Sequence, residues 1–85
     1  MSTKLHVGNI SSVVLESDLV AMFSQFGLFE AVEIERDPVT GINRGFAIVA
    51  MSRDEDAYAA IALLNFAQYA GRTIGVSRSR TVGPG

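Results

Sequence analysis

The stretch Arg44-Gly45-Phe46-Ala47-Ile48-Val49-Ala50-Met51 is an almost continuous apolar run. It is rich in residues that favour β-structure and short enough to form a single strand. A strand that is apolar on both faces is expected inside a sheet and not at its edge. The run therefore predicts a sheet whose central strand covers residues 44–51.

The residues before this run predict a partner strand and a hairpin. Residues 29–36 alternate, so that Val32 and Ile34 can point inward while Glu33 and Glu35 point to the opposite face. A loop rich in turn formers joins them to the central strand, with a proline that fixes φ and a glycine that can take a positive φ. We therefore expect a long hairpin loop after a strand that carries acid on its outward face.

Apolar residues at helical spacing predict two helices. The first apolar stripe runs from Leu15 to Phe26 and stops at Gly27, a residue suited to a left-handed C-cap. Ser52 and Glu55 match a capping box, and apolar residues then recur at i, i+3, i+4 and i+7. The second helix is therefore expected to begin beside Ser52.

Two further alternating segments complete the predicted sheet, at residues 4–10 and residues 72–78. The order β-α-β-β-α-β is that of the ferredoxin-like split βαβ, in the α+β class. This fold is a four-stranded antiparallel sheet with two helices on one face, and its other face stays open to solvent. We expect one domain over residues 1–81 and a flexible tail at residues 82–85.

The composition excludes several classes of site. The 85 residues include no cysteine and one histidine, His6, which excludes disulfides, thiolate zinc sites and multi-histidine metal sites. No apolar run approaches the roughly 18 to 20 residues that cross a bilayer, and no signal peptide is evident. We therefore expect an intracellular protein of the cytoplasm or nucleus with no cofactor, no small-molecule substrate and no membrane contact.

The net charge of −2 argues mildly against nucleic acid binding, because phosphate contacts need Lys or Arg.

The central run also carries a recognisable motif. Residues 44–51 resemble the ribonucleoprotein octamer K/R-G-F/Y-G/A-F-V-x-F/Y of the RNA recognition motif family, with five positions matching outright. Residues 5–10 resemble the shorter hexamer of that family, in the usual order and separation. Residues 37–45 follow its D-x-x-T-G-x-x-R-G hairpin, and the segment after Gly71 resembles its last strand. The resemblance covers roughly residues 4–80 and implies binding of single-stranded RNA.

The resemblance implies a stacking platform on the open face of the sheet. In this family, aromatic rings on the two central strands stack against unpaired bases. The platform positions here are His6 on the first strand and Phe46 and Ile48 on the third. Only Phe46 keeps the expected ring, and Met51 ends the octamer where an aromatic residue is usual. We therefore expect RNA binding of modest affinity.

The resemblance also implies polar contacts with bases and phosphates. The implicated residues are Asn9, Arg44, Ser77, Arg78 and Arg80. The three arginines would reach phosphates, whereas Asn9 and the backbone of residues 77–80 would contact bases. The sequence leaves open that Arg44 instead pairs with Asp37 or another acid of the hairpin.

The charges are distributed unevenly along the chain. Residues 1–70 contain four basic and nine acidic residues, whereas residues 71–85 contain three arginines and no acid. Glu33 and Glu35 would oppose an approaching phosphate backbone, although they could equally serve to solubilise an edge strand. Any attraction for RNA is therefore expected to be local, near Arg44 and the last strand.

A protein-interaction domain of the same fold is the alternative hypothesis, either through self-association or with another protein. The apolar residues that the helical stripes assign to solvent are Val13, Val20, Tyr58, Ala62 and Phe66. Tyr58 and Ala62 lie four apart and outside the core stripe, so they form one outward ridge. A contiguous exposed patch would indicate a partner, whereas scattered exposed apolar residues are normal.

An enzyme of this fold is a third hypothesis, because the same topology supports small catalysts. The residues assemble no catalytic constellation: His6 has no necessary acid beside it, and no serine has a base. Residues 54–56 are acidic in the first turn of a predicted helix, where their charges favour the helix dipole. We therefore predict that the chain is not an enzyme.

Overall fold

The computed structural model describes residues 3–79, in which the predicted order of strands and helices is interrupted by one additional small hairpin. The elements are β1 (Thr3–Gly8), α1 (Glu16–Phe23), β2 (Phe29–Arg36), β3 (Asn43–Met51), α2 (Asp54–Leu64), β4 (Gln68–Tyr69), β5 (Arg72–Thr73) and β6 (Gly75–Arg78). Arg80, a predicted phosphate contact, and the predicted tail at residues 82–85 lie outside the described residues.

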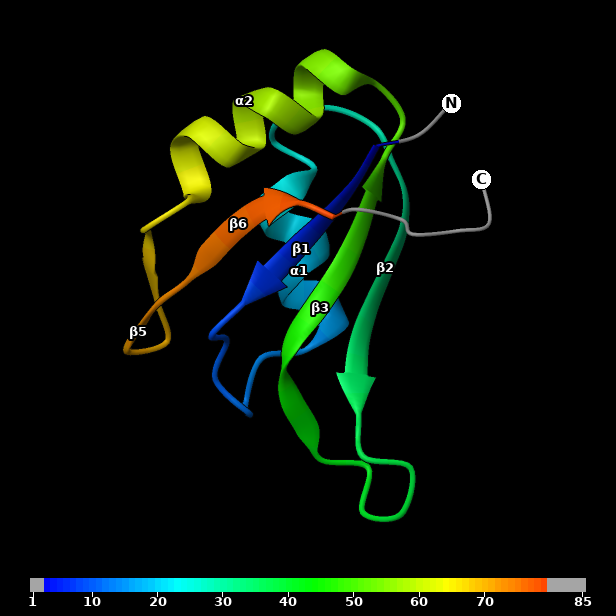
Figure 1. Cartoon of the computed structure of the whole chain (residues 1–85), viewed down its shortest axis with the longest axis vertical. Coiled ribbons are helices and arrows are strands. Elements are labelled where there is room, and N and C mark those ends of the chain that lie inside the picture. The colour runs from blue at the N-terminus through cyan, green and yellow to red at the C-terminus, as the bar shows by residue number, and fades with distance from the viewer. Residues whose placement is uncertain (1–2, 80–85) are drawn as a thin grey trace.

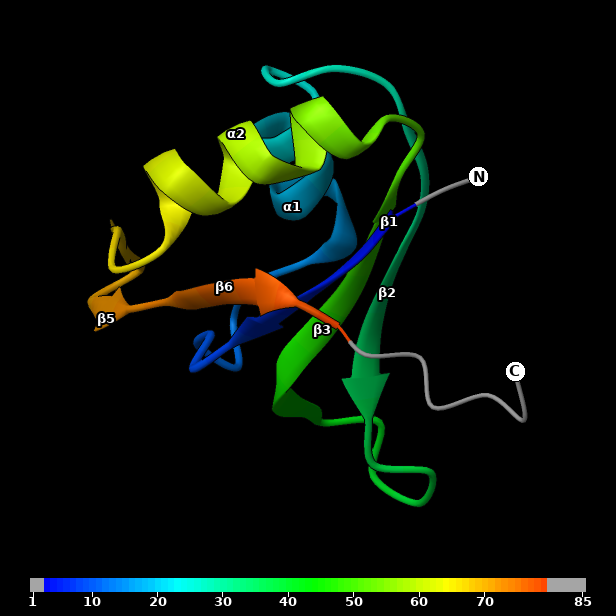
Figure 2. The same ribbon diagram turned by 45° about the horizontal axis from the view of Figure 1, so that its top comes forward.

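The main sheet has the strand order β2-β3-β1-β6, and the strands that neighbour one another are antiparallel. The apolar run at residues 44–51 forms most of β3, between β1 and β2, so its predicted central place is confirmed. Both helices lie on the same side of this sheet (Figure 1, Figure 2). The predicted α+β fold with two helices on one face is therefore confirmed, and the opposite face carries no helix among the described residues.

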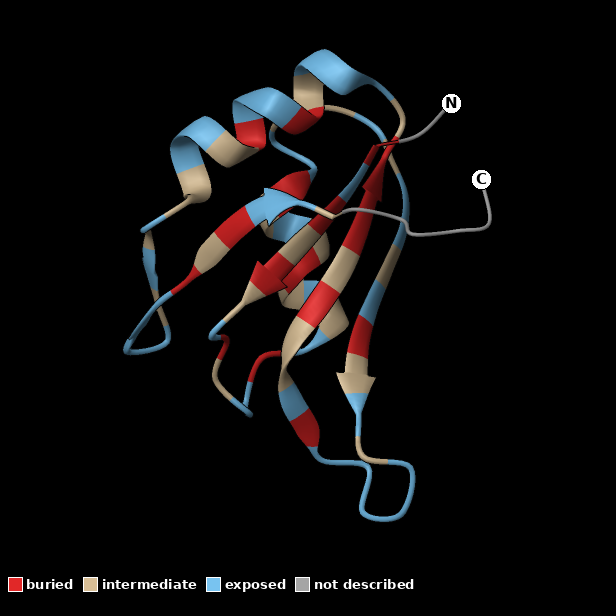
Figure 3. Cartoon of the chain, in the orientation of Figure 1, coloured by how far each residue is buried: buried red, intermediate tan, exposed pale blue. Residues whose placement is uncertain are grey.

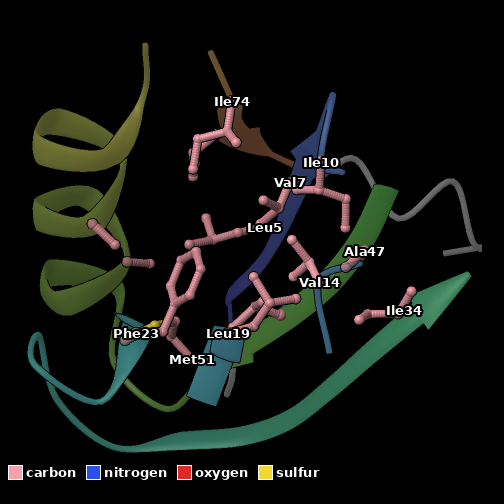
Figure 4. Close-up of a cluster of buried hydrophobic side chains, with 14 residues drawn as sticks. Leu5, Val7, Ile10, Val14, Leu19, Phe23, Ile34, Ala47, Met51 and Ile74 are labelled. Carbon is pink, nitrogen blue, oxygen red and sulfur yellow. The ribbon is translucent and has the colours of Figure 1, made fainter. Parts of the chain in front are cut away.

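The hydrophobic core fills the space between the helices and the sheet. Leu5 and Val7 point inward from β1, and Leu19 and Phe23 lie one helical turn apart on α1. Alternation along the strands is visible as bands of buried and less buried residues (Figure 3). The side chains gather into one cluster (Figure 4). This one-sided burial leaves every second side chain of the central strands on the open face.

The helix ends differ from the prediction in both helices. In α1, Ser24 is the C-cap and its N–H donates to the Val20 carbonyl at 2.9 Å, so the helix ends before Gly27. In α2, the predicted capping box is wrong because Arg53 and not Ser52 is the N-cap. The Ser52 N–H instead donates to the Leu28 carbonyl at 3.0 Å, so it is not available to the Glu55 side chain as a capping box requires.

The predicted last strand is divided in the structure. Arg72–Thr73 pairs with Gln68–Tyr69 as a separate two-stranded hairpin, and only Gly75–Arg78 pairs with β1. The turn between β4 and β5 consists of Ala70 and Gly71, both with positive φ, as a tight hairpin turn requires. An alanine seldom takes this conformation, so the local sequence does not predict the turn.

Candidate nucleic-acid interface

The three predicted platform side chains lie together on the open face. His6 is opposite Ile48 in the register of β1 and β3, and Phe46 follows diagonally, opposite Gly8. The rings of His6 and Phe46 are stacked, with centroids 5.4 Å apart and planes inclined by 24°. All three side chains are partly exposed. They form a half-buried strip across the two central strands, which is the arrangement that the octamer and hexamer predicted.

The platform belongs to a row of four register partners that crosses the sheet. From one edge to the other these are Glu33, Ile48, His6 and Ser77. Register partners in antiparallel strands present their side chains on the same face. The row therefore has a carboxylate at the β2 edge and a hydroxyl at the β6 edge.

A second row runs beside the first and is almost free of side chains. Phe46 is opposite Gly8, and Gly8 is opposite Gly75. A Cβ atom added at Gly8 would lie 3.2 Å from Cε1 of His6, so a side chain there would crowd the imidazole. The two glycines thus leave a strip of bare backbone beside the stacked rings, accessible to a flat ligand.

Asn9 and Arg72 form a polar cluster just beyond the end of β1. The Asn9 side chain donates from Nδ2 to the Thr73 carbonyl at 2.8 Å. Its Oδ1 accepts from Nε and Nη2 of Arg72 at 3.3 and 3.1 Å. Asn9 itself has φ of 58°, a left-handed conformation that asparagine tolerates. Both ends of the amide are occupied, so Asn9 orients Arg72 and the β4–β5 hairpin.

Arg44 and Arg72 line the same polar hollow. The other lining residues are Asn9, Ile10, Ser11, Ser12, Asn43 and Gly45, and none is acidic. Arg44 is exposed and makes no ion pair with another described residue. Two guanidinium groups beside neutral hydroxyl and amide groups make this hollow favourable for an anion.

The possible pairing of Arg44 with Asp37 does not occur. The N–H groups of Thr40 and Val39 donate to the Asp37 carboxylate at 3.0 and 2.8 Å and hold its pKa below the usual value. Arg44 adds a smaller charge effect in the same direction. The hairpin loop therefore satisfies Asp37 through its own backbone, which leaves the guanidinium of Arg44 available.

Arg78 lies apart from the platform. It is the register partner of Leu5, whose side chain is buried under the helices, so Arg78 stands on the helix-covered face. Its Nη1 donates to the Tyr58 hydroxyl on α2 at 3.3 Å. The structure therefore brings together His6, Phe46, Ile48 and Ser77, but it does not bring Arg78 to them.

The five apolar residues of the alternative hypothesis do not form one patch. Tyr58 and Ala62 are exposed on α2, whereas Val20 is partly buried on α1. The segment between β1 and α1, which contains Val13, lies on the other side of β6 from α2 in both ribbon views (Figure 1, Figure 2). Phe66 follows α2 and lines a hollow with His6, Gly8 and Ser77.

Two cations were missed by the sequence reasoning. Arg72 was assigned to the last strand, although the hairpin and Asn9 place it at the end of β1. Lys4 lies two residues before His6 and is exposed, so alternation alone could have assigned it to the open face. The open face therefore has more basic groups near β1 and β5 than the motif indicated.

The described residues show no sign of two other classes of site. None of their helices has the length and apolar character needed to cross a membrane. No three His, Asp or Glu side chains of residues 3–79 gather closely enough to hold a metal ion.

Comparison with known proteins identifies relatives of this chain. The family described as RNA recognition motif matches residues 5–75. The protein RbpA of Synechocystis sp., whose name attributes RNA binding to it provisionally, is 37% identical over 76 residues, which are 89% of this chain and 75% of RbpA. The crystal structure of RNA Binding Protein PG1 is 33% identical with a TM-score of 0.89, covering 92% of this chain and 94% of that one.

A solved complex that contains RNA has the same architecture. It is described as "SXL-LETHAL PROTEIN/RNA COMPLEX", has a TM-score of 0.91 and is 29% identical. The match covers 98% of this chain and 50% of the protein in the complex. The likeness thus extends over nearly all of the present chain.

Proposed function

Because the chain belongs to the RNA recognition motif family, we propose that it binds single-stranded RNA through the open face of its sheet. The observation that carries the proposal is the stacked pair of His6 and Phe46, with Ile48 beside it, on the face that no helix of residues 3–79 covers. Partly exposed rings at this place offer flat apolar surfaces to unpaired bases. Stacking of one base on an aromatic side chain is worth about 1 to 3 kcal/mol.

The polar groups around the platform have separate roles in this proposal. Arg44 and Arg72 hold phosphates, because their guanidinium groups line one hollow without a carboxylate. Ser77 contacts a base from the end of the first row. Asn9 acts by positioning Arg72 and not by direct base readout, since its amide is already bonded at both ends.

Several expectations from the sequence remain as proposals. Proteins of the RNA recognition motif family generally act by binding and not by catalysis, and we propose the same of this chain, without a cofactor. The domain is proposed to cover residues 1–81, with residues 82–85 as a tail. Phosphate contacts by Arg78 and Arg80 and an intracellular location stay predictions.

Replacing Phe46 tests the proposal. A pool of short random RNA oligonucleotides is titrated into the wild type and into Phe46→Ala, and amide chemical shifts are followed residue by residue. Loss of one stacked base is expected to raise the Kd by roughly 5- to 150-fold. In the wild type, the amides of Phe46 and Ser77 are expected to shift on addition of RNA.

Leu63→Ala is the matched control, because it removes an exposed apolar side chain from α2, in the helical layer. Its Kd is expected to stay within about twofold of the wild type. Wild-type amide shifts that do not move at low salt would contradict the proposal. So would equal affinities of the wild type and Phe46→Ala.

A further inference from the structure

Phe66 is held in an unfavourable conformation without being buried. It follows the C-cap of α2, has φ of 68° and is 77% exposed. A bulky residue rarely adopts the left-handed region, since its Cβ crowds the neighbouring carbonyl. Packing in the hydrophobic core therefore does not explain why Phe66 adopts this conformation. Strained residues that serve no packing role are often found at functional sites.

The backbone around Phe66 is fixed along the free edge of β6. The Phe66 N–H donates to the Ile74 carbonyl at 2.9 Å, and the Ile74 N–H donates to the Ala67 carbonyl at 2.8 Å. The preceding Asn65 accepts from the Val76 N–H through its Oδ1 at 3.0 Å. These three bonds attach the segment after α2 to the last strand. The position of Phe66 relative to the sheet is therefore set before any ligand binds.

Phe66 lines a hollow that reaches the open face of the sheet. The hollow is lined by His6 and Gly8 of β1, by Gly75 and Ser77 of β6, and by Asn65 beside Phe66. Gly8 and Gly75 are register partners, so backbone without side chains separates the imidazole from Phe66. The second row of the sheet, which begins at Phe46, therefore continues across bare backbone towards another ring.

The chemistry of this hollow suits a base and its phosphate. No carboxylate lines it, and the Ser77 hydroxyl and Asn65 amide are polar groups within it. Asn9 lines both this hollow and the neighbouring one, in which it orients Arg72. A nucleotide that leaves the His6–Phe46 pair along the second row would thus meet an aromatic wall close to an oriented guanidinium.

We propose that this hollow is an additional subsite for one unpaired nucleobase, which stacks on Phe66 beyond the edge of β6. The proposal rests on RNA binding by the sheet and extends that site by one nucleotide. The occupant is inferred to be a base because the hollow is continuous with the stacked pair on the sheet. Gly8 and Gly75 also leave its backbone bare, and none of the described residues that line it is acidic.

A single tryptophan placed at this position reports directly on stacking. The chain has no tryptophan, so Phe66→Trp introduces a unique fluorophore that keeps an aromatic surface. RNA of about ten nucleotides, as a random pool, is expected to quench its emission, and the affinity is expected to stay within about twofold of the wild type. Leu28→Trp is the matched control, at an exposed apolar residue between α1 and β2, and is expected to show no quenching.

Removal of the ring gives the complementary measurement. Phe66→Asn keeps a residue that tolerates a positive φ and is expected to retain the thermal stability of the wild type. Its affinity for the pool of about ten nucleotides is expected to fall roughly five- to tenfold. A pool of about four nucleotides can be held by the sheet platform alone, so the affinity of the variant for this pool is expected to fall at most about twofold. Leu63→Asn, at an exposed apolar residue in the last turn of α2, is expected to bind both pools as the wild type does.

The outcomes separate this subsite from RNA binding itself. If Phe46→Ala weakens both pools but Phe66→Asn weakens neither, the subsite does not exist and RNA binding by the sheet stands. If the fluorescence of Phe66→Trp is unchanged at saturating RNA, the subsite is likewise overturned. If Phe46→Ala also binds like the wild type, the failure lies in the proposed function.

Discussion

The two edges of the sheet differ sharply in the chemistry that they offer to a ligand on the open face. At the β2 edge, the row of register partners ends in the carboxylate of Glu33. At the β6 edge, it ends in the Ser77 hydroxyl, and bare backbone at Gly75 leads on to the exposed Phe66. One edge therefore repels a phosphate backbone, and the other presents polar and aromatic groups without a carboxylate.

This contrast explains how a chain with a net charge of −2 can bind RNA. Exposed charges are screened by salt over about 10 Å at moderate ionic strength, so local charges matter more than their sum. The acids occupy β2, the hairpin loop and the first turns of both helices. Arg44 and Arg72 share a hollow at the end of β1 and β3 instead. We infer that RNA lies over β3, β1 and β6 and avoids β2.

Removing the hydrogen bond between Asn65 and β6 should have the largest effect on the difference between the two edges of the sheet. In Asn65→Ala, the Val76 N–H loses its partner at the free edge of the sheet. An unsatisfied backbone donor that is partly buried costs about 1 to 2 kcal/mol, so the free energy of unfolding should fall by that amount in urea titrations. RNA of about ten nucleotides should also bind more weakly, because Phe66 is no longer held beside β6.

Gln68→Ala provides the comparison for this prediction, because Gln68 is exposed on β4 and makes no side-chain hydrogen bond with another described residue. Its free energy of unfolding should change by less than about 0.5 kcal/mol, as is usual for surface positions. A loss in Asn65→Ala no larger than this would mean that water replaces the amide at the edge of β6.

Arg72→Gln should have the next largest effect. The substitution is expected to change the affinity for RNA and not the free energy of unfolding. Each phosphate neutralised by a protein cation contributes about −0.7 to the slope of log K against log salt for a single strand. We expect the slope to become shallower by about that amount and the affinity at low salt to fall about three- to fivefold. The measurement is an RNA titration at several salt concentrations.

Arg53→Gln makes the same change of net charge in the helical layer, where Arg53 pairs with Glu55 at 2.6 Å. Its salt slope should match that of the wild type. Equal slopes in all three proteins would show that Arg72 contacts no phosphate, whereas equal reductions in both variants would assign the effect to net charge.

The sequence predicted the two central strands of the sheet better than the segments at its edges. The apolar run over residues 44–51 and the alternation around His6 have only one arrangement in which the core is filled, and that arrangement places Phe46 and Ile48 on the open face. The same alternation assigns Arg78 to the side of Ile74 and Val76, a signal that the resemblance to the family obscured.

The positions of Arg72 and Phe66 could not be predicted, because both depend on non-glycine residues with positive φ. Ala70 turns the chain so that Arg72 pairs with Tyr69 and not with β1. The sequence places Phe66 among the apolar residues that the helical stripes assign to solvent. The helix, however, ends at Leu64, and the left-handed turn directs the chain to the edge of β6. Such turns are set by tertiary bonds more than by local sequence.

Glu33→Gln should have the smallest effect and the opposite sign. Glu33 is exposed and is the register partner of Ile48, so its carboxylate lies at the end of the platform row. An exposed charge in water contributes only a few tenths of a kcal/mol to a neighbouring interaction, so removing it should strengthen RNA binding by less than about threefold. Glu55→Gln removes the same charge from the first turn of α2. A gain seen only in Glu33→Gln, and abolished at high salt, would place the repulsion at the β2 edge. A gain of equal size in both variants would instead mean that net charge sets the affinity, and the two edges would then be electrostatically equivalent to the approaching RNA.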